Sequence, residues 1–370
     1  MKRNLPYLRT AAVLMICEAL LSLTSNAEQV TLQQREKAAP SQIKDKLQSL
    51  RQKIQAEGLT FAVGYTSALD RSIQQLAGTI APRDLPDRAR RQNEIAEKLI
   101  KIESSAREEA LKSKPQLKEA MRGLKGTCAT NLKSFDWRSQ GKVTPVRDQQ
   151  LCGSCWAFAA VGAYEGSYLL RNNDASPDTL NTSEQDIVSC SGAGSCCGGY
   201  WEGALTYIIT TGIATEASYR YGAVDCGCDN SVARPYRATA WGYVEQSGGI
   251  PSVNQLKQAL CDHGPLSVGV FVSDLFQAYT DGVFNEHDTS DDINHGVTLV
   301  GWDDSKGAWL IKNSWGTDWG INGYMWIAYN SNKIGYAAVW VQAKSNLFVL
   351  PEERYKELLP NIKPFTDAKR

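Results

Sequence analysis

A single stretch, Gln149–Phe158 (QQLCGSCWAF), constrains this chain more than any other part of it. It places Cys155 directly before a run of small and aromatic residues that suits a buried helix. A cysteine at a helix N-terminus lies at the positive end of the helix dipole, which stabilises the thiolate and lowers its pKa. The side-chain amide of Gln149 can donate to an oxyanion beside the backbone N–H of Cys155, which the helix leaves unpaired. The stretch therefore predicts a nucleophilic thiol with an oxyanion hole next to it.

The same residues permit two other functions. Cys152 and Cys155 form a C-x-x-C at a helix start, which is typical of thiol oxidoreductases and of one half of a zinc site. The ten cysteines are scattered, however, and neither Cys226-Gly-Cys228 nor the adjacent pair at 196–197 has the spacing that would complete a zinc site. The pattern favours a nucleophile, with a thiol oxidoreductase as the alternative. No metal site and no cofactor are expected.

The N-terminus is organised like an export signal. Basic residues precede an apolar stretch at 11–23, and small residues lead to Ala27, which predicts a signal peptide at 1–27. The apolar stretch is too short for a membrane anchor. We therefore expect export to an extracellular, periplasmic or lysosome-like compartment, with no membrane attachment after signal removal. In such a compartment cysteines can pair.

The formal net charge is zero, but the charges are unevenly distributed. Residues 28–127 carry 19 Lys and Arg against 13 Asp and Glu, a net +6, and residues 128–344 carry 13 against 22, a net −9. Opposite net charges can attract the two parts across an interface. No basic run with interleaved aromatic residues indicates nucleic-acid binding. We divide the mature chain into residues 28–127, a main domain at 128–344 and a tail at 345–370.

Several further strings extend the pattern around Cys155. They are FDWR (135–138), VTPVRDQ (143–149), SEQDIVSC (183–190), CGGY (197–200), NHGVTLVGW (294–302) and KNSWGTDWG (312–320). Together they resemble the papain-like cysteine peptidases over residues 135–343. The resemblance implies an α+β fold of two lobes, one helical and one an antiparallel β-barrel-like lobe, with the active site in the cleft between them. Short β-branched and aromatic segments separated by turn residues after residue 264 agree with this.

The search for a general base is short because the chain has three histidines. His295 follows Cys155 by 140 residues, within the separation typical of this arrangement. We expect His263 to cap a helix and His287 to lie in an exposed acidic loop. Asn313 can accept a hydrogen bond from the imidazole and hold its orientation. The resemblance implies catalytic roles for Cys155, His295 and Asn313, with Gln149 in the oxyanion hole.

The resemblance also implies a substrate-binding set, which consists of Gly198, Gly199, Ile293, Val339 and Trp315. The glycine pair would let substrate backbone lie against the enzyme as an added strand. The two aliphatic residues would line the pocket for the second residue before the cut. Because neither carries a charge, that pocket should favour an apolar side chain. The tryptophan would shield the imidazole–amide hydrogen bond from water.

Two disulfides are implied by the same resemblance. One joins Cys152 to Cys196, and the other joins Cys190 to either Cys226 or Cys228. The remaining cysteines of the main domain could form up to two more bridges, which spacing does not assign.

Residues 28–127 are expected to be a propeptide. Apolar residues at helical spacing predict a helix from Ser41 to Gly58, with these two residues as its caps. An extended segment at 61–65, a short helix and a Leu-x-Gly then resemble the inhibitory part of the cathepsin B propeptide. A highly charged helix at 87–113 should end before Pro115, and we expect proteolytic removal there.

These observations predict a secreted cysteine endopeptidase, made as a zymogen and monomeric, that acts on protein or peptide substrates and is inhibited by its own propeptide. A catalytically silent papain-like binding protein is the alternative from another class. The chain has no His-His loop of the kind found in cathepsin B, so carboxydipeptidase activity is not expected. Gln150 stands where the family usually has glycine, in the loop above the oxyanion hole.

Overall fold

The computed structural model describes residues 32–124, 126–288, 290, 292–351 and 353. The predicted signal peptide and most of the tail lie outside the described residues. Within the part described, no helix combines the length and the apolar character needed to cross a membrane.

The helical lobe is built around α6 (Cys155–Arg171), with α7 (Glu184–Cys190) and α8 (Trp201–Thr210) packed beside it. Small residues at Ala157, Ala159, Ala160 and Ala163 let neighbouring elements approach α6 closely, and 14 of its 17 residues are buried. A helix enclosed on nearly every side is held rigidly. Cys155, its first residue, is therefore fixed in position.

The second lobe is a nine-stranded sheet in the order β1-β7-β10-β9-β8-β6-β11-β5, with β2 paired to β8. Its pairs are antiparallel except for β10 and β7, which are parallel. Two short helices, α9 (Val253–His263) and α10 (Asp274–Ala278), accompany it. The strands are β1 (Phe61–Val63), β2 (Ser134–Asp136), β5 (Ala238–Tyr243), β6 (Leu266–Val270), β7 (Tyr279–Phe284), β8 (His295–Asp303), β9 (Ala308–Lys312), β10 (Tyr324–Ala328) and β11 (Tyr336–Ala343). The two-residue strands β3 (Gly194–Ser195) and β4 (Gly198–Gly199) pair in the helical lobe.

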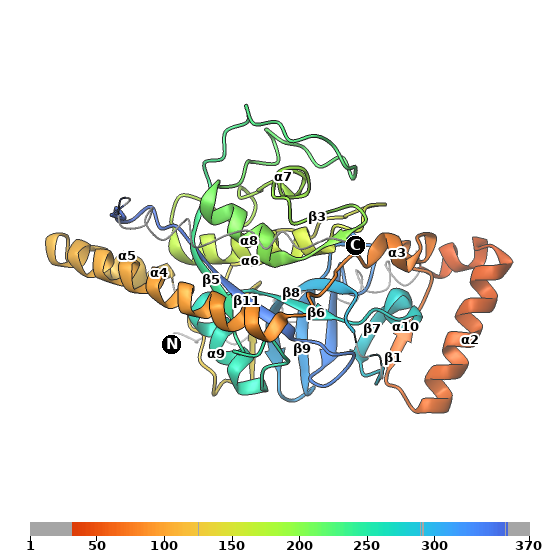
Figure 1. The fold of residues 1–370 in the computed structure, drawn as a ribbon. Coiled ribbons are helices and arrows are strands. Elements are labelled where there is room, and N and C mark those ends of the chain that lie inside the picture. Colours follow the sequence, from red (N-terminus) through yellow and green to blue (C-terminus); the bar gives the residue numbers. More distant parts are fainter. Residues whose placement is uncertain (1–31, 125, 289, 291, 352, 354–370) are drawn as a thin grey trace, which may run out of the picture.

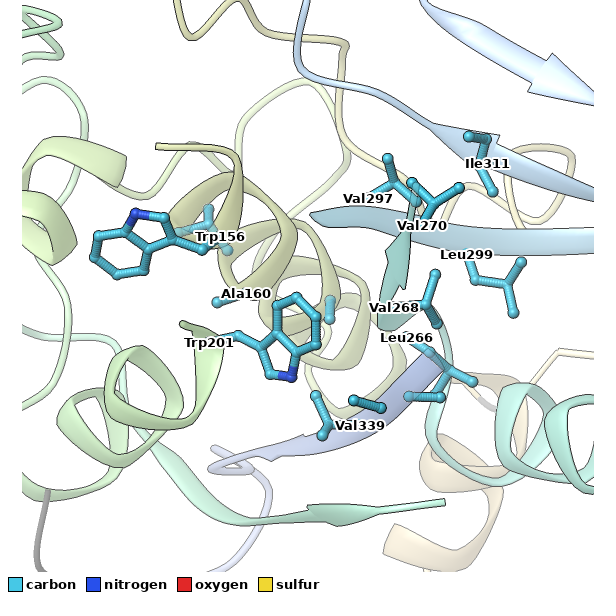
Figure 2. Packing of buried hydrophobic residues seen from close by; sticks show 14 of the residues in the cluster. Trp156, Ala160, Trp201, Leu266, Val268, Val270, Val297, Leu299, Ile311 and Val339 are labelled. Atoms are coloured by element: carbon cyan, nitrogen blue, oxygen red, sulfur yellow. The ribbon is translucent and has the colours of Figure 1, made fainter. Parts of the chain in front are cut away.

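A continuous apolar core joins the two lobes. Figure 2 shows Trp156 and Ala160 of α6 with Trp201 of α8 on one side, and aliphatic side chains of β6, β8, β9 and β11 on the other. The fold is therefore the α+β, two-lobed arrangement expected from the sequence. Since α6 contacts β8 directly, the core fixes the distance between the first residue of each element.

The N-terminal part, residues 32–127, contributes β1 to the edge of the sheet and contacts the two lobes at opposite ends (Figure 1). At one end are α2 (Ser41–Glu57), β1, the 3₁₀ helix η1 (Ser67–Asp70) and α3 (Ile73–Leu76). At the other end are α4 (Leu85–Ser113) and α5 (Leu117–Leu124). Pro40, and not Ser41, is the N-cap of α2, while Gly58 ends that helix in the left-handed conformation at φ 65° as predicted.

Three disulfides are formed within the described residues: Cys152–Cys196, Cys190–Cys228 and Cys128–Cys261. The structure thus places Cys228, and not Cys226, opposite Cys190. Cys197 and Cys226 are exposed free thiols, so the four cysteines that spacing left unassigned supply one further bridge and not two.

Candidate active site

Strand pairing brings the predicted base and its orienting amide together. His295 begins β8, and Asn313 directly follows β9, which pairs antiparallel with β8. His295 Nε2 lies 2.8 Å from Asn313 Oδ1, and both side chains are buried. The Nδ1 atom is also buried and has no hydrogen-bond partner among the described residues. Because Asn313 occupies Nε2, Nδ1 is the nitrogen that remains for proton transfer.

Trp315 covers this hydrogen bond. Its ring centroid lies 4.8 Å from that of His295, and its side chain is fully buried. Phe276 adds a second aromatic ring, 5.7 Å from Trp315. Water is thereby excluded from the imidazole–amide pair. The structure does not bring the other two histidines here: His263 ends α9 and stacks on Trp340, and His287 is exposed.

Cys155 is completely buried at the N-terminus of α6. Burial by itself raises the pKa of this thiol. The charge of His295, together with hydrogen bonding from Thr79 and the backbone of Gly296, outweighs burial and lowers the pKa from 9.0 to about 7. A substantial thiolate fraction near neutral pH is what a sulfur nucleophile requires.

The redox alternative does not fit this geometry. Cys152 is bonded to Cys196, with a Cα–Cα distance of 4.5 Å, and Cys155 is a free thiol. The two cysteines of the C-x-x-C motif are therefore not a redox pair.

Neighbouring residues fix the side chain of Gln149, which the sequence analysis expects to form part of the oxyanion hole. Its Oε1 accepts from Ser314 Oγ at 2.7 Å, which fixes the amide plane. Its Nε2 donates to Cys152 O at 2.9 Å and to Leu76 O at 3.1 Å. A carbonyl of the N-terminal part thus takes the donor that an oxyanion would use. The next residue, Gln150, adopts φ 54°, a left-handed conformation that explains why glycine is usual there.

The N-terminal part runs through the cleft directly over the thiol. Gly78 N donates to Cys155 Sγ at 3.3 Å, and the Thr79 hydroxyl lies 3.2 Å from the same sulfur. A Cβ on Gly78 would stand 1.8 Å from Gly153 O, so glycine is required at this position. The Leu-x-Gly string at 76–78 was the sequence signal for this segment, but its contact with the thiol could not be read from it.

The predicted glycine pair receives the same segment. Gly199 N donates to Gly78 O at 2.8 Å, and Ile80 N donates to Gly199 O at 3.0 Å, forming a parallel bridge at Thr79. A Cβ on Gly198 would stand 2.8 Å from Gly78 O. The pair therefore binds extended backbone, here that of its own chain.

Two side chains that the sequence analysis missed lie beside the start of β8. A Cβ on Gly296 would lie 3.2 Å from the Thr79 hydroxyl and 3.2 Å from the Trp201 ring, so both side chains border this strand. Ile293 is 5% exposed, and Val339 is fully buried in the core on the β11 side (Figure 2). Trp201 carried no signal beyond its position after the CGGY string.

The site combines a buried thiol with an imidazole that is fixed by an amide. It lies in the cleft between a helical lobe and a sheet lobe, and this combination defines the class of thiol proteases. The chain belongs to the papain family of cysteine proteases, whose family model matches residues 132–343. It is similar to cathepsin L of Sarcophaga peregrina, 41% identical over 209 residues that cover 54% of this chain and 60% of that protein. It is also similar to cathepsin S of Bos taurus, 42% identical over 213 residues that cover 55% and 62%. The chain spans about three-fifths of the length of these relatives.

A solved structure extends the likeness beyond the family region. The digestive procathepsin L2 proteinase from Tenebrio molitor larval midgut matches with a TM-score of 0.60 and 28% identity, covering 82% of this chain and 94% of that one. Because residues 132–343 are a smaller share of the chain than this, the match includes part of residues 32–131.

Proposed function

We propose that the chain is an exported, monomeric cysteine endopeptidase, made as a zymogen, that hydrolyses protein or peptide substrates. Cys155 is the nucleophile and His295 the general acid and base. Asn313 orients the imidazole, and Gln149 with the backbone N–H of Cys155 stabilises the oxyanion. The three disulfides support export to an oxidising compartment.

The chemistry follows from the positions of these groups. The Cys155 thiolate attacks the scissile carbonyl carbon, and the oxyanion accepts hydrogen bonds from Gln149 Nε2 and the Cys155 N–H. Protonated His295 gives its Nδ1 proton to the leaving amine, which departs and leaves a thioester on Cys155. Neutral His295 then takes a proton from water, and the hydroxide attacks the thioester. Collapse of the second intermediate expels the thiolate and releases the carboxylic acid product.

The occupied cleft is the observation that carries this proposal. Three parts of the site bind residues 76–80 at once: the thiol, the amide of Gln149 and the backbone of Gly199. These are the groups that a substrate's carbonyl and backbone would need. A silent binding homologue would have no need to block its own thiol, so the contact favours an enzyme kept inactive until activation.

Ion pairs between the N-terminal part and the main domain support release of the propeptide at acidic pH. Lys46 pairs with Asp274 at 2.7 Å, and Lys53 pairs with Glu286 at 2.9 Å, so the N-terminal part supplies the cation in both contacts. Arg71, which follows η1, pairs with Asp148 at 2.7 Å in the same sense. Acidification towards pH 4 makes residues 128–344 less negative as a whole, while Lys and Arg keep their charge, so the electrostatic attraction between the two parts weakens. These pairs agree with the opposite net charges of the two parts.

The test is activation of the purified zymogen. Protein held at pH 7 and at pH 4.5, each at low and high salt, is sampled for hydrolysis of a fluorogenic peptide. We expect activity to develop faster at pH 4.5, with high salt narrowing the difference because exposed pairs are screened. Equal rates under all four conditions would mean that the cleft contacts alone, and not charge, keep the zymogen closed. No hydrolysis in any sample would contradict the proposed activity.

A further inference from the structure

The long helix α4 blocks nothing in the cleft. It lies along β5, the edge strand of the large sheet, far from α2 and α3 (Figure 1). Gln92 Nε2 donates to Trp241 O at 2.7 Å. Asn93 accepts from Tyr243 N at 2.8 Å and donates to Tyr243 O at 3.2 Å. These amides satisfy backbone groups of β5 that an edge strand otherwise leaves unpaired. Exposed edge strands with unpaired backbone groups are a common cause of aggregation.

The helix α4 also supplies charged partners for side chains of the main domain, residues 128–344. Arg88, 6% exposed, places Nη1 3.3 Å from Oε2 of Glu202, whose other oxygen accepts from the Tyr243 hydroxyl. Farther along α4, Glu103 accepts from Arg171, Thr239 and Gln342. Loss of α4 would remove Arg88, the charged partner of the buried Glu202, and a buried charge without its partner is strongly destabilising. It would also remove Glu103, the charged partner of the half-buried Arg171.

Apolar contacts secure both ends of α4. Near its start, Leu85 is 3% exposed and packs on Gly248, where a Cβ would meet it at 2.6 Å. Near its end, Ala106 forms a small core with Phe348 and Leu350 of the tail. The chain after α5 is then tied to α9 through the disulfide Cys128–Cys261.

Residues 81–84 link the segment that lies in the cleft (residues 76–80) to α4, and none of these four residues is buried. Ile80 is 60% exposed, and both Arg83 and Asp84 are exposed. A protease can therefore reach this link without unfolding either neighbour.

We propose that activation cuts the chain between Ile80 and Leu85, and that α4 stays on the mature enzyme as the permanent cover of β5. The reaction is hydrolysis of one peptide bond, with water as co-reactant. The inhibitory segment that leaves ends near residue 83, whereas residues 85–127 remain joined to the catalytic part. This rests on the proposed function and replaces the expected cut within residues 87–113.

Mass spectrometry and N-terminal sequencing of the acid-activated protein test the proposal. The expected mature chain starts between residues 81 and 85 and contains α4. An active enzyme that starts between residues 114 and 128 and lacks α4 overturns the proposal while leaving the proposed function intact.

A second experiment does not depend on self-activation. The Cys155→Ser zymogen is treated with trypsin, which cuts after Arg83, and the products are separated by size. We expect the fragment from Asp84 onward to persist after the inhibitory segment is lost. Digestion through α4 as fast as at Arg83 would contradict the proposal.

Matched variants identify what holds the helix. Arg88→Ala removes the buried partner of Glu202, and Arg90→Ala removes an exposed arginine from the same helix. Trypsin should cut α4 at least tenfold faster in R88A than in R90A. Asn93→Ala, which loses only the bonds to β5, gives the same comparison if R88A does not fold. Equal rates in all variants would show that these contacts do not hold α4.

Discussion

Gly78→Ala should open the closed zymogen. The added Cβ would stand 1.8 Å from Gly153 O and 2.6 Å from Gly153 C, which are backbone atoms. Gly153 cannot easily withdraw, because its N–H donates to Cys196 O at 2.9 Å and the neighbouring Cys152 is bonded to Cys196. The inhibitory segment must therefore move away from the thiol.

The hydrogen bonds at risk give the magnitude. Gly78 N donates to Cys155 Sγ, Gly199 N donates to Gly78 O, and Thr79 N donates to Asn294 O. A buried hydrogen bond contributes about 0.5–1.5 kcal/mol net, so loss of all three costs about 2–4 kcal/mol. Since about 1.4 kcal/mol is tenfold in an equilibrium constant, the open population should rise ~30–1000-fold.

The assay is the rate at which iodoacetamide alkylates Cys155 in uncut zymogen at pH 7, followed by peptide mass. Gly227→Ala is the control, because a Cβ there meets no atom within 4 Å, its φ is not in the left-handed region and the residue is exposed. We expect G78A to react ~30–1000-fold faster than wild type and G227A to react within a few-fold of it. A wild-type rate in folded G78A would refute the view that Gly78 seals the site.

Three further predictions concern pH, catalysis and specificity. Burial, reinforced by Glu165, raises the pKa of Glu184 to about 8. The contribution of this group to the free energy of unfolding is therefore fully present below pH 4.5 and is lost as pH rises to 8. Glu184→Gln should flatten this loss of a few kcal/mol, measured by urea unfolding at pH 5 and pH 8. His295→Ala should abolish peptide hydrolysis, and Asn313→Ala should leave reduced but measurable kcat, because the amide only orients the ring. Peptide libraries should favour Leu or Val over Arg two residues before the cut, and the opposite order would contradict the apolar pocket expected from Ile293.

Much of the fold and site could be predicted because the evidence was local. The run after Cys155 is apolar on every face, which indicates a buried helix, and α6 is enclosed in this way. The short β-branched segments around His295 and Asn313 predict paired strands, and β8 with β9 places the two side chains 2.8 Å apart.

The remaining features depend on contacts between distant parts of the chain. Nothing in the charged sequence of α4 indicates that Arg88 is buried against Glu202, because its spacing resembles that of a solvated helix. The bridge Cys128–Cys261 spans 133 residues and could not be assigned from spacing. The blocked thiol likewise needs the cleft, which only the assembled lobes create.

Labelling with an epoxide that traps papain-like thiolates tests the central claim most directly. The structure offers internal controls, because Cys197 and Cys226 are free and exposed whereas Cys155 is free and buried beneath residues 78–79. After acid activation, peptide mapping should find one adduct, on Cys155, with complete loss of hydrolysis, and the uncut zymogen at pH 7 should remain unlabelled. An adduct on Cys197 or Cys226 alone, or full activity after Cys155 is labelled, would contradict the account.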